Sequence, residues 1–158
     1  MSKSNPYSGK VRVRACGLIV SSHNILLVQQ NVPTREAPVW IPPGGGVHPG
    51  EPAEKALTRE CREETGVTPS GLSLRYVHEF IEETYHAIEL YFLATGFSGK
   101  VQKGSDPEHS QNDQLILEVG FKPIDELFKL EVIPEFLADE LKTERYLMNQ
   151  IDYFKNGR

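Results

Sequence analysis

Residues 40–67 read WIPPGGGVHPGEPAEKALTRECREETGV, and this stretch decides the fold. Its first part, Trp40 to Glu51, holds four glycines and three prolines among twelve residues, so we expect a shaped loop without a regular element. Its second part, Pro52 to Thr65, predicts the clearest helix of the chain. Pro52 suits a first helical turn, and Gly66 suits the position after the last turn. A glycine-rich loop therefore leads directly into an acidic helix.

The predicted helix carries glutamates on its apolar face. At about 100° per residue, Ala56 and Leu57 define that face, and Glu60 and Glu64 fall between them, with Glu63 at the edge. Carboxylates crowded on an inward face repel one another and lose hydration, which costs free energy unless a cation compensates. Their oxygens suit hard cations such as Mg²⁺ or Mn²⁺. Because glycine has no Cβ, the preceding loop can approach an anion closely, and the combination indicates phosphate chemistry.

A solvated acidic face is the alternative interpretation of these glutamates. Acidic residues on helices usually pair with basic ones in water, and Lys55, Arg59 and Arg62 are available as partners. The inward position of Glu60 and Glu64 weighs against this interpretation. The decision between the two depends on the longer pattern.

The longer pattern resembles the Nudix box. Five residues separate Gly45 from Glu51, and seven more precede the run RECREETGV at residues 59–67. Cys61 is the one departure, since the family usually has an aliphatic residue there, and a free cysteine packs as a small hydrophobe. The approach at residues 40–45 and the segment PIDEL at residues 123–127 are also similar to the family, so the resemblance covers residues 10 to 130.

The resemblance implies an α/β fold, the Nudix-type α/β/α sandwich with a mixed sheet. Hydropathy patterns lead independently to strands mixed with two principal helices, which implies a sheet covered on both faces. We expect one domain over residues 1–158, with residues 1–9 as a loose lead-in. The expected strands are residues 10–20, 24–30, 72–80, 85–95 and 115–122, followed by a helical segment over 134–154, with a long polar loop at 97–114.

The resemblance also implies a metal site. Glu60, Glu63 and Glu64 would coordinate Mg²⁺ or Mn²⁺, and the carbonyl of Gly45 would be a further ligand. Arg59 and Glu51 would orient each other and hold the catalytic carboxylates.

The general base that activates water remains open between several carboxylates. Glu60 or Glu63 is the first choice, and Glu118, ahead of the PIDEL segment, is favoured as an extra ligand or base. Glu108 and Asp113 in the long loop are further candidates.

Substrate contacts are less determined. Gly44 and Gly46 offer backbone groups, and Arg35, Lys100 or Lys103 would reach terminal phosphates. Tyr85 stands where proteins similar to dinucleoside polyphosphate hydrolases carry a tyrosine. The proline that marks proteins similar to ADP-ribose hydrolases is absent, because that region reads Glu82-Glu83-Thr84.

Composition limits the partners. The formal charge of −5 argues against a general nucleic-acid surface. No apolar run approaches the ~20 residues that cross a bilayer, and Met1 to Lys10 lacks a secretory apolar segment. Two cysteines, Cys16 and Cys61, indicate a reduced cytoplasmic protein. Family members are often homodimers, and the apolar stripe of the C-terminal segment permits a homodimer.

We therefore predict a hydrolase that cleaves a phosphoanhydride bond in a nucleoside diphosphate linked to another moiety, for example a nucleoside triphosphate, a nucleotide sugar or a dinucleoside polyphosphate. The alternative is a non-catalytic nucleotide-sensing Nudix module. Such modules often have an eroded box, whereas this one is intact. A structural domain with a merely solvated acidic helix is the third hypothesis.

Overall fold

A computed structural model describes residues 6–32, 35–104 and 116–156. The strands are β1 (Val11–Ser21), β2 (Asn24–Gln30), β3 (Val39–Ile41), β4 (Gly44–Gly46), β5 (Thr68–Glu82), β6 (Tyr85–Ser98), β7 (Ile116–Pro123) and β8 (Asp152–Lys155). The helices are α1 (Ala53–Thr65) and α2 (Phe136–Lys142), with the 3₁₀ segments η2 (Ile124–Lys129) and η3 (Arg145–Leu147).

Eight strands of the described residues form one mixed sheet, and six of them follow the order β3-β2-β1-β6-β5-β8. β4 joins it beside β1, and β7 joins it beside β2. The pairs β1–β6 and β5–β8 are parallel, whereas β1–β2, β2–β7 and β5–β6 are antiparallel. β1 is thus the strand on which the sheet is organised, since β2, β4 and β6 all pair with it.

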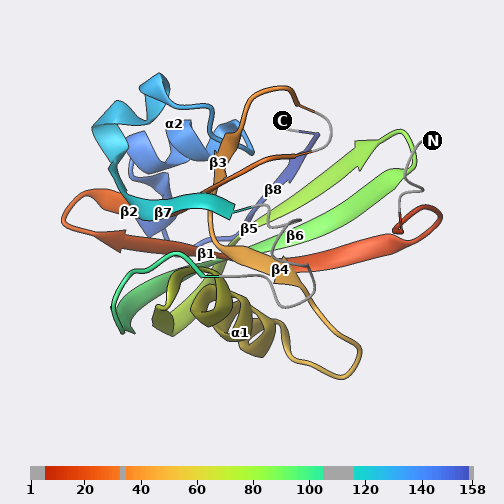
Figure 1. The fold of residues 1–158 in the computed structure, drawn as a ribbon, viewed down its shortest axis with the longest axis horizontal. Helices are drawn as coiled ribbons and strands as arrows, with labels where there is room; N and C mark the ends of the chain where they lie inside the picture. The colour runs from red at the N-terminus through yellow and green to blue at the C-terminus, as the bar shows by residue number, and fades with distance from the viewer. Residues whose placement is uncertain (1–5, 33–34, 105–115, 157–158) are drawn as a thin grey trace.

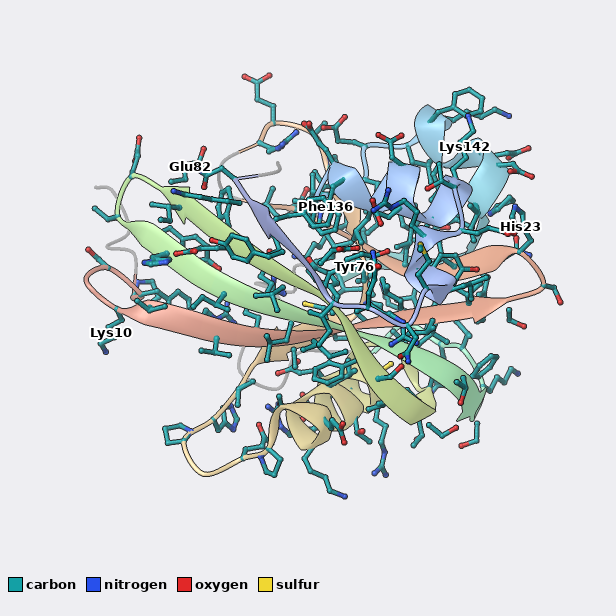
Figure 2. The ribbon with its side chains drawn as sticks, turned by 180° about the vertical axis from the view of Figure 1, so that it is seen from behind. Lys10, His23, Tyr76, Glu82, Phe136 and Lys142 are labelled. Carbon is teal, nitrogen blue, oxygen red and sulfur yellow. The ribbon has the colours of Figure 1, made fainter. Side chains whose placement is uncertain are left out.

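Helical segments cover both faces of the sheet (Figure 1). On one face, α1 packs through Leu57, whose methyl group would lie 3.1 Å from a Cβ added at Gly17 of β1. On the other face, α2 packs through Leu137 and Leu141, which are buried. Tyr76 of β5 and Phe136 of α2 meet there edge to face, on the side away from α1 (Figure 2). The α/β/α sandwich with a mixed sheet is therefore confirmed.

The expectation that Trp40 to Glu51 has no regular element was wrong. β3 pairs with β2, and β4 pairs with β1 through Gly44↔Cys16 and Gly46↔Arg14. Three consecutive glycines carry no side chains, so their backbone can lie flat against β1. The pairing partners are distant in sequence, which is why local turn signals did not reveal them.

The C-terminal segment also differs from its predicted helix. α2 ends at Lys142, and Glu144 has a left-handed backbone with φ of 58°, which interrupts the helix. The chain then forms η3 and finally β8, which adds a parallel strand beside β5. Phe154 of β8 stacks on Phe136 with ring centroids 4.0 Å apart. The apolar stripe assigned to one long helix is therefore divided between a short helix and a strand, and much of it covers the sheet.

The other elements agree with expectation apart from their lengths. β5 and β6 begin or end several residues beyond the predicted limits, and only Glu83 and Thr84 remain between them. In the described part of the chain, no helix has both the length and the apolar character needed to cross a bilayer.

Candidate active site

The glycine segment β4 lies between β1 and α1. Its entry and exit are fixed by backbone hydrogen bonds, from the N–H of Gly17 to the Pro43 carbonyl (2.8 Å) and from the N–H of Val47 to the Val13 carbonyl (2.9 Å). A Cβ at Gly44 would lie 2.3 Å from the carbonyl oxygen of Ala15. The sheet therefore holds this loop in one shape and leaves no room for a side chain at Gly44.

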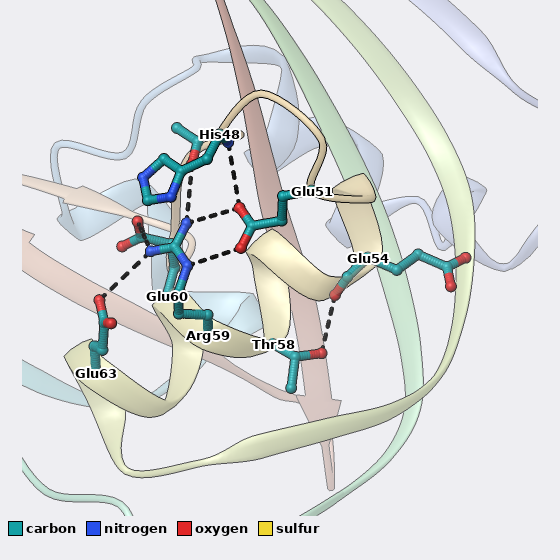
Figure 3. A network of polar contacts seen from close by, with 8 residues as sticks. His48, Glu51, Glu54, Thr58, Arg59, Glu60 and Glu63 are labelled. Carbon is teal, nitrogen blue, oxygen red and sulfur yellow. Dashed lines mark hydrogen bonds and ion pairs between the residues drawn. The ribbon is translucent and has the colours of Figure 1, made fainter.

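Arg59 of α1 connects the loop with the helix (Figure 3). Its Nε and Nη2 donate to the two carboxylate oxygens of Glu51, both at 3.0 Å, and Nη2 also donates to the Gly46 carbonyl at 3.1 Å. Its Nη1 donates to Glu60 at 2.8 Å and lies 3.7 Å from a carboxylate oxygen of Glu63. The predicted mutual orientation of Arg59 and Glu51 is present as a two-pronged ion pair.

The charge state of this network follows from its hydrogen bonds. Chiefly the hydrogen bond from Arg59 lowers the pKa of Glu51 from 4.5 to about 2, and the backbone N–H of His48 contributes. The same bond raises the pKa of Arg59. Both groups therefore stay ionised across the physiological pH range.

Two glutamates of α1 lie against the glycine segment. The Glu60 carboxylate occupies the space beside Gly45, because a Cβ built on Gly45 would lie 2.4 Å from Glu60 Cδ. The Glu64 carboxylate accepts a long hydrogen bond of 3.4 Å from the N–H of Gly44. The Glu64 side chain is buried at 8% exposure, and that of Glu60 is 18% exposed. The inward placement inferred from helical periodicity agrees with these positions.

The donor set fits a hard divalent cation. Carboxylate oxygens of Glu60 and Glu64 approach the backbone of Gly44 and Gly45, and oxygen donors of this kind suit Mg²⁺ or Mn²⁺. Within the described residues, no three acidic, histidine or cysteine side chains converge closely enough to enclose a metal ion. Glu63 and Glu60 both lie near Arg59 Nη1, at 3.7 Å and 2.8 Å.

A short backbone segment closes the far end of α1. The N–H groups of Gln102 and Gly104 donate to the carbonyls of Thr65 and Glu64, both at 2.9 Å. A Cβ on Gly104 would lie 1.7 Å from the Glu63 carbonyl oxygen, so only glycine fits there. We call residues 99–104 the strap. It satisfies helix-terminal carbonyls that otherwise lack partners. The sequence indicated only a polar loop here, and its glycines were the one available signal.

Several predicted site residues lie elsewhere. Arg35 forms an ion pair with Glu131, and Glu118 forms one with Lys122 at 3.0 Å on the exposed side of β7. Tyr85 begins β6 and contacts the ring of Phe80. Lys100 and Lys103 are exposed on the strap. Glu108 and Asp113 lie outside the described residues. None of these roles is tested by this geometry, so they stay predictions.

A second arginine cluster was not anticipated from the sequence. Glu89 of β6 is 1% exposed and has two partners. One carboxylate oxygen binds Nη1 of Arg14 in β1, and the other lies 2.7 Å from Nδ1 of the fully buried His78 in β5. In the described structure, Arg14 Nε is buried without a hydrogen-bond partner. The available signal was a charged residue at position 14 and another at 89, each followed by an apolar run of its strand.

Arg14 and Glu89 line a partly open cavity of about 40 Å³. Pro42, two residues before Gly44, lines it as well, and Ile41, Tyr91 and Ile133 supply apolar walls. Because Arg14 and Cys16 pair with Gly46 and Gly44, the cavity lies beside the glycine segment.

A mixed sheet between helical layers, with a glycine segment facing the glutamates of one helix, is the arrangement that the resemblance to the Nudix family led us to expect. The chain belongs to the Nudix hydrolase family, because the family model of the NUDIX domain matches residues 10–140. The resemblance drawn from the box and the assignment as a hydrolase are both confirmed.

Individual relatives agree with this assignment. The ADP-ribose pyrophosphatase of Methanocaldococcus jannaschii is 32% identical over 144 residues, covering 89% of this chain and 73% of the relative. The 8-oxo-dGTP diphosphatase of Proteus vulgaris is 30% identical over 96 residues, covering 58% of this chain and 84% of the relative. The crystal structure of the MutT NUDIX hydrolase from Burkholderia pseudomallei has a TM-score of 0.69 and 29% identity, covering 84% and 97% of the two chains.

Proposed function

We propose that this chain is a Mg²⁺- or Mn²⁺-dependent pyrophosphohydrolase that cleaves a phosphoanhydride bond in a nucleoside diphosphate linked to another moiety. The observation that carries the proposal is the approach of the Glu60 and Glu64 carboxylates to Gly45 and Gly44, stabilised by Arg59. Buried or half-buried carboxylates in such a place need a compensating cation.

Each residue has a distinct part in the proposed chemistry. A bound divalent cation supplies charge neutralisation at the phosphates and a more acidic water. Glu60, Glu63, Glu64 and the Gly45 carbonyl would hold it. Arg59 keeps Glu60 and the Gly46 carbonyl in place while Glu51 holds the guanidinium.

The base that takes the proton from water is Glu60 or Glu63, with Glu118 as the further candidate. For Glu118 to take part, its carboxylate must leave Lys122.

The substrate is proposed at the level of its shared chemistry. The named relatives act on ADP-ribose and on 8-oxo-dGTP, each a nucleoside diphosphate extended by another group. The backbone of Gly44 and Gly46, together with Arg35 and Tyr85, is proposed to contact it. A cytoplasmic location is supported by Cys16 and Cys61, which are both buried and form no disulfide within the described residues. Burial raises the pKa of Cys61 to about 12. A homodimer stays a proposal without a structural argument.

Replacing Glu64 by Gln tests the proposed metal site. We expect Glu64→Gln to reduce turnover at least a hundredfold, because it removes one anionic ligand, while the thermal transition stays cooperative. The matched control is Glu54→Gln, since Glu54 is exposed on the same helix and points away from Arg59 (Figure 3). Full activity of Glu64→Gln in Mg²⁺, with the control also active, would refute the metal assignment.

A substrate panel separates the enzyme from a sensing module. The wild-type chain is incubated with nucleoside triphosphates, nucleotide sugars and dinucleoside polyphosphates in Mg²⁺ or Mn²⁺, and products are separated by chromatography. We expect release of a nucleoside monophosphate or another phosphate-bearing product. Nucleotide binding without any hydrolysis across the panel would favour the sensing module instead.

A further inference from the structure

Two charged clusters among the described residues, one around Arg59 and one around Arg14, lie at the same glycine segment but differ in how completely they are hydrogen-bonded. In the cluster beside the cavity, Arg14 gives Nη1 to Glu89 and keeps Nε buried without a partner among the described residues. Native proteins rarely bury a donor without a partner, because its lost hydration is not replaced. Such a group is expected to serve a water molecule or a ligand.

The charge and the apolar walls of the cavity indicate which kind of ligand it would bind. Glu89 places a carboxylate beside the guanidinium, so the pair has little net charge and offers a phosphate anion no net positive charge. Ile41, Tyr91 and Ile133 provide apolar walls that suit a flat aromatic ring. A neutral acceptor on the edge of a nucleobase satisfies both conditions.

The size of the cavity limits what enters it. A volume of about 40 Å³ accommodates the edge of a ring and not the whole base. The space is partly open, so the rest of the base would remain outside. The cavity lies beside β4, so the sugar and phosphates of a nucleotide whose base enters it would extend toward the glycine segment.

From these observations we infer that Arg14 determines base specificity: its guanidinium, whose side chain lines the cavity and is 14% exposed, donates to an acceptor on the edge of the substrate base. The inference rests on the proposed function. A base with a keto oxygen on that edge, guanine or uracil, accepts this hydrogen bond. A base with an amino group there, adenine or cytosine, directs a donor at a donor. Arg14 is thus a residue that reads the base and takes no part in the cleavage of the phosphoanhydride.

The experiment varies both the protein and the base. Dissociation constants of GMP, UMP, AMP and CMP are measured by calorimetry in EDTA, so that no turnover or metal contributes. The wild-type chain is compared with Arg14→Lys, which keeps the charge beside Glu89 but lacks the planar guanidinium. Arg12→Lys is the matched control, because Arg12 lies two residues earlier on the same strand, stacked over Tyr7.

We expect the wild type and Arg12→Lys to bind keto nucleotides at least roughly tenfold more tightly than amino nucleotides, a step of about 1.4 kcal/mol. In Arg14→Lys the ratio should fall toward one. With the preferred substrate, KM should rise by about the same factor while kcat changes less than about threefold.

A modified ligand makes the test independent of whether Arg14→Lys folds. The monophosphate of 2-aminopurine riboside lacks the keto oxygen of GMP, and we expect it to bind the wild type about tenfold more weakly than GMP. Equal affinities for the two ligands, or an unchanged base ratio in a folded Arg14→Lys, would overturn the inference. Hydrolysis of the substrate panel without base preference refutes only the role of Arg14, whereas absence of hydrolysis refutes the proposed function.

Discussion

Arg59 and Arg14 each hold a glutamate close to the same glycine segment, but they differ in their hydrogen bonds: every guanidinium nitrogen of Arg59 has a partner, whereas Arg14 Nε has none among the described residues. The three nitrogens of Arg59 bind Glu51, Glu60 and the Gly46 carbonyl. Arg14 lines a cavity and binds Glu89, and its Nε has no hydrogen-bond partner among the described residues. Arg59 links side chains and backbone of the site, whereas Arg14 retains a donor that no described residue binds. Under the two roles that we propose, the hydrogen bonds of a side chain distinguish the arginine that positions the site from the arginine that contacts the base, whereas their charge is the same.

Removing a charge from the buried Arg14 cluster should cause the largest loss of stability. Replacing Glu89 by Gln leaves the Arg14 guanidinium buried without a counter-charge, and we expect a loss of about 3 kcal/mol in the free energy of unfolding. Urea denaturation at pH 7 measures it. Glu79→Gln is the control on the neighbouring strand, where a part-exposed glutamate binds His86, and it should lose less than about 1 kcal/mol. Similar losses in the two variants would contradict the assigned difference in burial.

A smaller effect is expected on catalysis when Arg59 is shortened. Arg59→Lys keeps a positive charge but cannot bridge Glu51, Glu60 and Gly46 together, so we expect kcat/KM to fall about 10- to 100-fold. Steady-state kinetics on the best substrate of the panel gives the value. Arg62→Lys, an exposed change on the same helix, should remain within twofold of the wild type. If Arg59→Lys is equally active, the fully bonded arginine does not position the site.

The smallest expected effect is on the pH dependence of stability. The pKa of Glu51 is lowered to about 2 in the folded chain, below its ordinary value of 4.5, mainly by the hydrogen bond from Arg59. The ionised pair therefore stabilises the fold above pH 4.5, and this contribution is lost as the pH falls from 4.5 toward 2. Thermal melts by circular dichroism should show a shallower acid decline for Glu51→Gln than for the wild type. Parallel curves would count against the pairing.

Sequence alone predicted the parts of the molecule that depend on local structure. The bounds of α1, the left-handed Gly66 after it and the inward position of Glu64 all follow from helical periodicity and end signals within a few turns. The Nudix box added the roles of Glu51 and Arg59, and their ion pair is present.

The parts that sequence missed depend on contacts between distant residues. β4 is a strand only because β1 lies beside it, and β8 exists only beside β5. The Arg14–Glu89 pair joins residues 75 positions apart, so no local pattern could reveal it. The same limit applies to the cavity, whose walls come from residues between Arg14 and Pro134.

The strap, residues 99–104, limits where the chain can change in length near the proposed active site. Its backbone holds the last turn of α1, where Glu63 and Glu64 are carried, and Gly104 tolerates no side chain. A deletion between Gly99 and Gly104 would remove these backbone hydrogen bonds and loosen the turn that carries Glu63 and Glu64. An insertion after Gly104 would leave both hydrogen bonds in place, so we expect it to be tolerated better than a deletion within the strap.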